Sequence, residues 1–283
     1  MTRFTTTQLT TAQPTTAQPT TAPPTTMPFT RTVHTEWVKF RSLRSTWYTL
    51  AGLALAGLGI TALALGSVGA EYADMTAAER MDWDPTNQSL TTYLVAQLII
   101  GVLGILVITS EYATGLIQTS LAATPRRHRL LAAKAVLVTA VAAVAGQALM
   151  FASFFLGQAM LGAQGVPNAS IGDPGVLSAV VGGGVYLAAI SLLALALGVI
   201  LRATAGALAT LVAIIFLIPG FAGLFPGWLG WLLDFWPTLG AAEVLTTVPN
   251  PEYPAPWLNL AGMCLGVAAT LTVAFVLFRR RDV

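Results

Sequence analysis

The sequence predicts an all-α polytopic membrane protein, with six transmembrane helices, an N-terminal interfacial helix and a re-entrant outer segment between helices five and six. Of its 283 residues, 55% are hydrophobic and 9% are charged, and the mean hydropathy is +0.72. An average soluble domain carries about 25% charged residues. Several apolar runs also reach roughly 20 residues, the length of helix that crosses the hydrocarbon core. Such runs must be helical, because lipid offers no partners to unpaired backbone groups.

Residues 1–30 are rich in Thr, Pro, Gln and Ala, and the unit Thr-Thr-Ala-Gln-Pro recurs, ending at Pro14 and again at Pro19. A segment with so little apolar bulk cannot form a core, so we expect a disordered cytoplasmic tail. Either this tail is passive, with Met27 as an alternative start of translation, or it is a docking segment.

Residues 31–46 are expected to form the interfacial helix. At about 100° per residue, one stripe of this helix and its continuation carries the apolar side chains of Trp37, Phe40, Leu43 and Trp47. Lys39, Ser42, Ser45 and Thr46 lie largely opposite. This pattern is typical of a helix in the headgroup layer, with aromatic rings facing the membrane and bases facing anionic lipid. The alternative is an ordinary basic flank of the first span.

Residues 47–283 are expected to form a six-helix transmembrane domain. Its six apolar runs cover residues 47–69, 90–109, 134–160, 177–201, 205–225 and 257–278. The stretch 226–256 between the last two runs is also apolar, but it is interrupted by Pro226, Pro237, Pro249, Pro251, Pro254 and Pro256. Prolines at this density cannot continue one helix. We therefore expect short helices that dip into the membrane from the outer side.

Basic and acidic residues separate to opposite sides of the six-span arrangement. One side holds Arg31, Lys39, Arg41, Arg44, Arg126, Arg127, Arg129, Lys134, Arg202, Arg279, Arg280 and Arg281. The other side holds Arg80 together with Glu71, Asp74, Glu79, Asp82, Asp84, Asp173, Asp234, Glu243 and Glu252. The positive-inside rule places the basic side in the cytoplasm. The sequence thus predicts a multi-pass protein of the cell membrane with both termini cytoplasmic.

The sequence lacks the patterns of common catalytic and metal sites. Its two histidines, His34 and His128, lie outside the spans, which excludes a membrane-embedded metal site built on histidine. Neither lysine follows a glycine, so the chain has no Gly-Lys-Ser/Thr loop for ATP. The predicted spans contain no acidic residue, which argues against a proton relay or an intramembrane carboxylate enzyme. We expect a non-catalytic chain with no metal and no cofactor of its own.

The connection between the second and third spans has the pattern of a helix end, a turn, a short helix and a return. Glu111 comes near the end of the second span, Gly115 follows as a turn residue, and Pro125 precedes a basic cluster. An acid in the last turn of a helix opposes the helix dipole, so Glu111 needs a cationic partner. Arg126, Arg127 or a basic residue of another chain are candidates. Alternatively, the connection is a topogenic loop whose arginines only hold the orientation.

Together with the basic start Trp37-Val38-Lys39-Phe40-Arg41, this connection resembles ABC exporter permeases of the ABC-2 type. The residues that carry the resemblance are Glu111, Tyr112, Gly115, Ile117, Thr119, Leu121, Pro125, Arg126, Arg127 and Lys134. The resemblance covers about residues 27–283. It implies six spans per subunit, an interfacial helix before the first, a coupling helix between the second and third, and re-entrant outer helices before the sixth.

The resemblance further implies the membrane-spanning permease subunit of an ATP-binding cassette exporter. A separate ATPase subunit would hold ATP and contact Glu111, Tyr112, Gly115, Ile117, Leu121, Pro125, Arg126 and Arg127. A second permease subunit, identical or related, and membrane lipid are the other expected partners, and nucleic acid is not. Lipid-like, peptide and drug-like cargoes all remain open. The alternatives are a membrane-integral enzyme acting on lipids or peptides, and a non-transporting anchor or immunity protein. The excess of arginine over lysine is typical of a high-GC bacterium.

Overall fold

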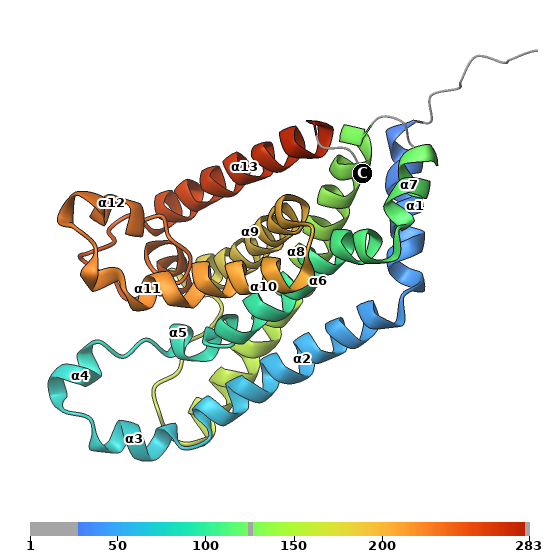
Figure 1. Cartoon of the computed structure of the whole chain (residues 1–283). Helices are drawn as coiled ribbons and strands as arrows, with labels where there is room; N and C mark the ends of the chain where they lie inside the picture. The colour runs from blue at the N-terminus through green and yellow to red at the C-terminus, as the bar shows by residue number, and fades with distance from the viewer. Residues whose placement is uncertain (1–27, 124–126, 281–283) are drawn as a thin grey trace, which may run out of the picture.

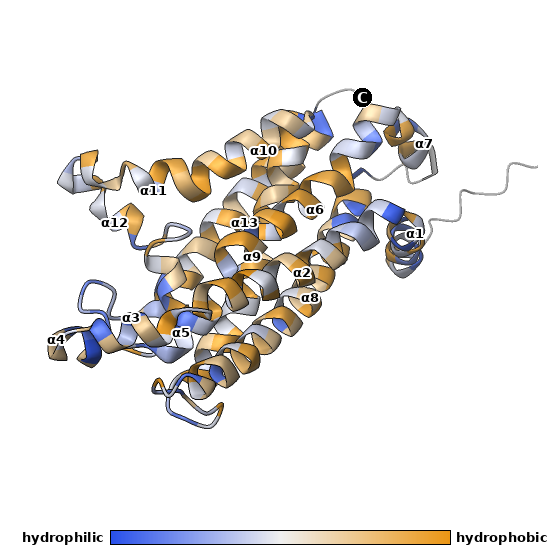
Figure 2. Cartoon of the chain, turned by 90° about the horizontal axis from the view of Figure 1, so that it is seen from below, coloured by the Kyte–Doolittle hydropathy of each residue, from blue (hydrophilic) through white to orange (hydrophobic). Residues whose placement is uncertain are grey.

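The computed structural model describes residues 28–123 and 127–280, and the regular secondary structure of these two ranges is entirely helical. Long helices run between two ends of an elongated bundle (Figure 1). Helices α1 and α7 and the last turn of α13 lie at one end, and α3, α4 and α12 lie at the other. Apolar residues cover the length of the bundle, whereas hydrophilic residues gather at its ends (Figure 2). Almost the whole predicted tail lies outside the described residues.

Five helical segments of the described chain are long and apolar enough to cross a membrane: Arg44–Asp74, Pro85–Thr114, Arg127–Ala163, Val176–Leu201 and Pro256–Arg280. Their main helices are α2 (Arg44–Leu65), α6 (Tyr93–Thr114), α8 (Arg127–Ala163), α9 (Val176–Leu201) and α13 (Pro256–Arg280). Each of the five segments contains one of the predicted apolar runs. The runs at 47–69 and 90–109 extend beyond α2 and α6 into the neighbouring short helices. Hydropathy therefore located the long helices correctly.

The run predicted at 205–225 forms a shorter and irregular helix. Thr204–Gly220 consists of α10 (Thr204–Val212), a π-helical turn (Ala213–Leu217) and α11 (Ile218–Gly220). Two side chains from outside the helix donate hydrogen bonds to carbonyls of the π-helical turn. The Trp236 indole N–H donates to the carbonyl of Ile214 over 2.7 Å, and the Thr238 hydroxyl donates to the carbonyl of Ile215 over 2.6 Å. The described chain thus has five full-length apolar helices and this sixth, shorter one.

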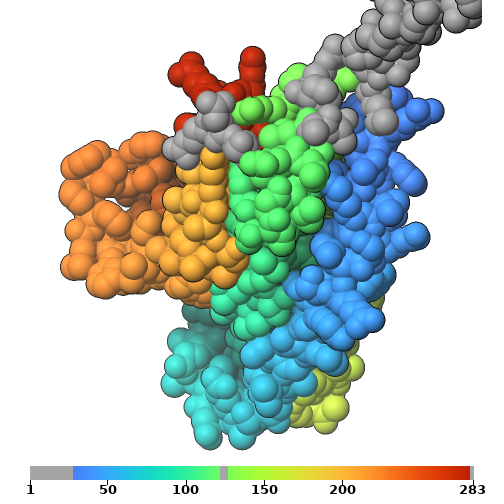
Figure 3. All heavy atoms as spheres, turned by 45° about the vertical axis from the view of Figure 1, so that its right-hand side comes forward, coloured from blue at the N-terminus to red at the C-terminus, as the bar shows by residue number. Residues whose placement is uncertain are grey.

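Helix α9 forms the centre of the bundle and contacts α6, α8 and α13. Its sequence is rich in Gly and Ala, and such small residues let helix backbones approach closely. The approach to α6 is closest at Gly104, where an added Cβ would lie 2.5 Å from the carbonyl oxygen of Ser191. Any larger residue at position 104 would therefore force the two helices apart. Figure 3 shows α2, α6 and α10 side by side on one face of the bundle.

The end opposite α1 is built from short helices. They are α3 (Val68–Asp74), α4 (Ala77–Met81), α5 (Pro85–Leu90), α12 (Gly230–Leu233) and the 3₁₀ turns Ala222–Leu224, Gly227–Leu229 and Gly240–Leu245. Asp84 joins the two connections that form this end. Its carboxylate caps α5 by accepting from the N–H groups of Thr86 and Asn87, and it also accepts from the N–H groups of Thr247 and Val248 and the Thr247 hydroxyl.

The N-terminal helix differs from the prediction of a single helix over 31–46. Helix α1 spans Phe29–Ser42, and Leu43 is extended, with φ −82° and ψ 121°, before α2 begins. The predicted stripe is therefore split, because Trp47 belongs to α2. The buried face of α1 consists of Thr32, Glu36 and Phe40, whereas Trp37 and Leu43 are exposed. Of the predicted stripe, Phe40 packs into the bundle, whereas Trp37, Leu43 and Trp47 are exposed, so their contact with the membrane stays a prediction.

Candidate functional site

Helix α7 (Leu116–Ala123) is a short helix between α6 and α8, in the connection where the sequence predicted one. Helix α6 ends at Gly115, whose left-handed backbone (φ 71°) is one that glycine adopts without strain. Helix α8 begins at Arg127. Of the predicted contact residues, Glu111 and Tyr112 belong to the last turns of α6, and Ile117 and Leu121 belong to α7. Pro125 and Arg126 lie outside the described residues.

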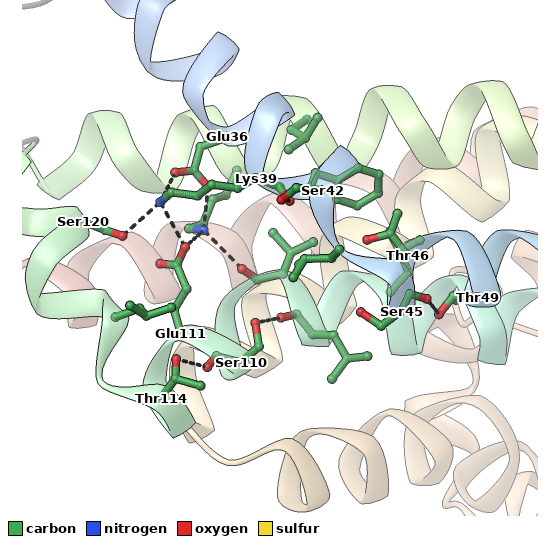
Figure 4. A pocket seen from close by; sticks show the side chains of 18 of the residues that line it. Glu36, Lys39, Ser42, Ser45, Thr46, Thr49, Ser110, Glu111, Thr114 and Ser120 are labelled. Atoms are coloured by element: carbon green, nitrogen blue, oxygen red, sulfur yellow. Dashed lines mark hydrogen bonds and ion pairs between the residues drawn. The ribbon is translucent and has the colours of Figure 1, made fainter.

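A cluster of four charged side chains joins α1, α6 and α8 beside α7 (Figure 4). We call Glu36, Lys39, Glu111 and Lys134 the charge cluster. The Lys134 ammonium lies 2.7 Å from Glu36 Oε2 and 2.8 Å from Glu111 Oε1. The Lys39 ammonium lies 2.8 Å from Glu36 Oε1 and 3.3 Å from Glu111 Oε1. Each lysine thus bridges both glutamates.

The charge cluster also holds α7 in place. The Lys39 ammonium donates to the hydroxyl of Ser120 on α7 over 3.0 Å, and the Lys134 ammonium donates to the carbonyl of Val107 on α6 over 3.2 Å. Ile117 packs into the apolar cluster that contains Phe40, Ile108 and Leu130. Helix α7 is therefore fixed to the bundle by one buried apolar side chain and one hydrogen bond to a charged group.

Because the charge cluster is largely buried, its lysines and glutamates interact strongly with one another. The side chains of Lys134, Glu36 and Glu111 are 2%, 4% and 9% exposed. Burial by itself raises the pKa of Glu36, but the neighbouring ammonium groups of Lys134 and Lys39 outweigh it and hold this pKa below its ordinary value. Burial likewise lowers the pKa of Lys39, and the hydrogen bonds and charges of Glu36 and Glu111 outweigh it and raise that pKa. Glu36 and Lys39 are therefore both charged at neutral pH.

The partners of Glu111 differ from the expected ones. The sequence suggested Arg126, Arg127 or another chain, whereas in the structure Lys39 and Lys134 of the same chain pair with this carboxylate. The sequence also assigned Glu36, Lys39 and Lys134 no role together. One signal in the sequence pointed to Lys39 and Lys134. They are the only two lysines of the chain, and all its other Lys or Arg positions hold arginine.

The two faces of α7 differ in exposure. Ile117 and Ser120 are buried, whereas Leu116, Gln118 and Thr119 are exposed. Ile117 therefore faces the bundle, although the sequence placed it among the residues that contact a partner. Leu116, an apolar side chain that is 54% exposed, is the residue that the sequence analysis missed. Leu116 is thus an apolar side chain on a face of α7 that is otherwise polar at Gln118 and Thr119.

A second contact lies on the other side of α6. The Arg202 guanidinium lies over the ring of Tyr112, 5.3 Å from its centroid. Arg202 ends α9 with a left-handed backbone (φ 53°). A cation over an aromatic ring is attracted to its face. The end of α6 is thus linked both to α1 and α8 through the charge cluster and to the end of α9 through Tyr112.

Its helices and their composition define this chain as a multi-pass membrane protein. Residues 32–220 match the family model described as ABC-2 family transporter protein. The match covers about two thirds of the chain, so the protein belongs to the ABC-2 transporter family, whose members are membrane permeases. The matched region includes the charge cluster and α7 and ends before the Pro-rich segment. No curated protein matches this sequence.

Proposed function

We propose that this chain is the permease subunit of an ATP-binding cassette exporter and that α7 is the helix through which a separate ATPase subunit drives it. The observation that carries the proposal is the position of α7. It exposes Leu116 on one face, and its other face is fixed to α1, α6 and α8 through Ile117 and the charge cluster. A displacement of α7 would therefore act on the ends of α1, α6 and α8 together.

The proposed orientation places α1, α7 and the end of α13 in the cytoplasm. These elements share one end of the bundle (Figure 1). Arg41 and Arg279 belong to α1 and α13, Arg44 and Arg127 follow α1 and α7, and Arg202 at the end of α9 lies over Tyr112 at the end of α6. The opposite end carries the acidic residues of α3, α4 and the segment 226–256. This asymmetry supports a cytoplasmic location for both termini through the positive-inside rule.

We also propose that Thr204–Gly220 crosses the membrane as the fifth of six spans. Its 17 residues correspond to roughly 26 Å of helix at about 1.5 Å per residue, close to the thickness of the hydrocarbon core. The segment 226–256 then lies at the outer surface, with its short turns in the headgroup layer. Exposed Trp228 and Trp231 support this depth, because tryptophan is enriched at membrane interfaces.

In the proposed assembly, a second permease subunit completes the transport pathway and two ATPase subunits bind ATP. The chain itself needs no cofactor. ATP binding drives transport only if it favours one arrangement of the permease over another. The rigid connection from α7 to the charge cluster supplies the physical link for that bias.

The test changes the exposed face of α7 and leaves the charge cluster intact. Leu116→Glu adds a charge to the proposed contact surface, so we expect the co-purified ATP-binding subunit to fall by about tenfold or more, since one hot-spot contact contributes about 2 kcal/mol or more. The full-length protein is purified from its native membranes, and the ATP-binding subunit and its ATP hydrolysis are quantified.

The matched control is Met81→Glu, which adds the same charge at an exposed apolar residue of α4, at the opposite end. This variant should keep the ATPase bound. Glu111→Ala would be less informative, because Glu111 is buried and its loss disturbs the bundle itself. Unchanged ATPase binding by correctly inserted Leu116→Glu would refute the role of α7.

A further inference from the structure

A cavity of about 510 Å³ lies beside the charge cluster, between α1, the start of α2, the end of α6, α7 and α8. Its apolar wall includes Phe40, Leu103, Leu106 and Leu137. Serine and threonine hydroxyls line much of the remainder, and the charge cluster closes one side (Figure 4). A volume of this size lies within the range of small-molecule sites, about 300–1,000 Å³. The cavity therefore has both an apolar part and a polar part.

Three of the hydroxyl groups along the cavity present acceptors rather than donors. The hydroxyls of Ser110, Thr114 and Thr49 each donate to a carbonyl one turn back in their own helix, over 2.6, 2.8 and 2.9 Å. A hydroxyl has one hydrogen to donate and two lone pairs to accept. Because the hydrogen is already used, each of these groups can offer only its lone pairs to a ligand.

The two lysines also have no donor left for a ligand. An ammonium carries three N–H donors. Lys134 uses them on Glu36, Glu111 and the Val107 carbonyl. Lys39 uses them on Glu36, Glu111 and Ser120. An anion in the cavity would therefore have to displace an existing ion pair or hydrogen bond before it found an ammonium donor.

One acceptor of the charge cluster is left over. Both lysines contact Oε1 of Glu111, whereas Oε2 is buried and has no hydrogen-bond partner among the described residues. Glu111 lines the cavity, and its exposed fraction is 7%. A buried carboxylate oxygen without a donor is destabilising. A ligand that brought a donor would relieve this cost.

We propose that this cavity binds an amphiphile whose polar head is a primary ammonium and whose tail is a hydrocarbon chain. The ammonium would donate to Glu111 Oε2 and to the acceptor hydroxyls, and the tail would pack along the leucines. A quaternary ammonium has the same charge but no N–H to donate, and an anionic head finds both lysine ammonium groups already fully paired. Two sources carry the required chemistry: an aminophospholipid of the surrounding membrane, and a free long-chain amine. The site does not depend on ATPase coupling.

The binding test uses the detergent-solubilised full-length protein and native mass spectrometry. Dioleoyl phosphatidylethanolamine is compared with phosphatidylcholine and phosphatidylglycerol of the same chains, and dodecylamine is compared with dodecanol. We expect at least one primary amine to bind about tenfold or more tightly than its partner without an N–H⁺, the effect of one charge-assisted hydrogen bond. Preference for the lipid alone identifies the membrane as the source, and preference for dodecylamine alone identifies a free amine.

Two variants test the position of the site. Glu111→Gln replaces the unpaired acceptor with a donor or a neutral oxygen and should remove the preference for the amine. Thr49→Phe fills the cavity from α2 without touching the charge cluster, so it should reduce binding even if Glu111→Gln fails to fold. Glu71→Gln, at an exposed residue of α3, is the control and should bind as the original protein does. Equal binding of all lipids and of both dodecyl compounds, or a preference for the amine that survives Thr49→Phe, would overturn the proposal.

Discussion

At the scale of single residues, the charge cluster explains why the two lysines of this chain lie where they do. Lysine carries a compact ammonium with three donors, whereas the planar guanidinium of arginine suits a single paired carboxylate. Lys134 and Lys39 each bridge two carboxylates and one further oxygen. An arginine at either position would have to widen the space between α1, α6 and α8.

The altered pKa values set the pH range of this stabilisation. The pKa of Glu36 is lowered in the folded protein, so its contribution is complete above the ordinary value of 4.5 and is lost as the pH falls through the lower folded value. The pKa of Lys39 is raised, so its contribution is complete below the ordinary value of 10.5 and is lost as the pH rises through the higher folded value. Both contributions are therefore complete between these two ordinary values.

Lys134→Met tests the balance of the charge cluster. It leaves Glu36 and Glu111 with only Lys39 between them, and we expect the free energy of unfolding to fall by about 3–5 kcal/mol, because an uncompensated charge remains buried. Adding Glu36→Met restores neutrality and should recover most of the loss. Thermal unfolding of the purified variants in detergent measures both effects.

Arg41→Met is the control for this series, because it removes a positive charge from an exposed residue of the same helix α1. Its melting temperature should stay within the error of the original protein. A double variant that is less stable than Lys134→Met alone would show that the glutamates, rather than the charge balance, hold α1 to the bundle.

At the scale of elements, Asp84 joins two connections that are far apart in the sequence. Asp84→Ala removes five hydrogen bonds, including those to Thr247 and Val248. We expect faster amide hydrogen exchange in α5 and around 244–250, and unchanged exchange in α1 and α7. Mass spectrometry of the exchanged peptides measures this pattern.

Asp82→Ala, two residues earlier and exposed, is the matched control and should leave exchange unchanged. Equal exchange in Asp84→Ala and Asp82→Ala would show that other contacts hold the segment 240–255 in place.

The elements also show which parts of the fold are readable from sequence. Long apolar runs predicted the five full-length helices, because burial in lipid depends on composition over many residues. The break at Leu43 was not predicted, because no glycine or proline marks it and Ser42 and Arg44 are compatible with a continuous helix. The partners of Glu111 were not predicted either. They come from α1 and α8, and only the packing of three helices brings them together.

At the scale of the whole molecule, the number of crossings decides where each connection lies. Single cysteines are introduced into a Cys264→Ser background and labelled with a reagent that does not cross the membrane. Ser170→Cys and Leu224→Cys are expected to react in intact cells, and His128→Cys only after permeabilisation. All three original residues are exposed in the structure, so access to the reagent depends on the membrane alone.

Position 224 is decisive in this series, because it follows the short helix Thr204–Gly220. Reaction of Leu224→Cys only after permeabilisation would mean that this helix enters the membrane and returns. The chain would then have five crossings, and its C-terminus would lie outside. Cytoplasmic reaction of Ser170→Cys would instead reverse the whole orientation.

The π-helical turn Ala213–Leu217 changes the phase of the helix that contains it. Each extra residue in a helical turn rotates all that follows by about 100° relative to an uninterrupted α-helix. The buried stripe of Ala207, Leu211 and Ile215 accordingly ends inside the turn, and no residue of Ile218–Gly220 is buried. The first half of this helix packs against α6 and α9, and the carbonyls of Ile214 and Ile215 within the turn accept from Trp236 and Thr238. One helix thus joins the bundle through its side chains and the segment 226–256 through its backbone carbonyls.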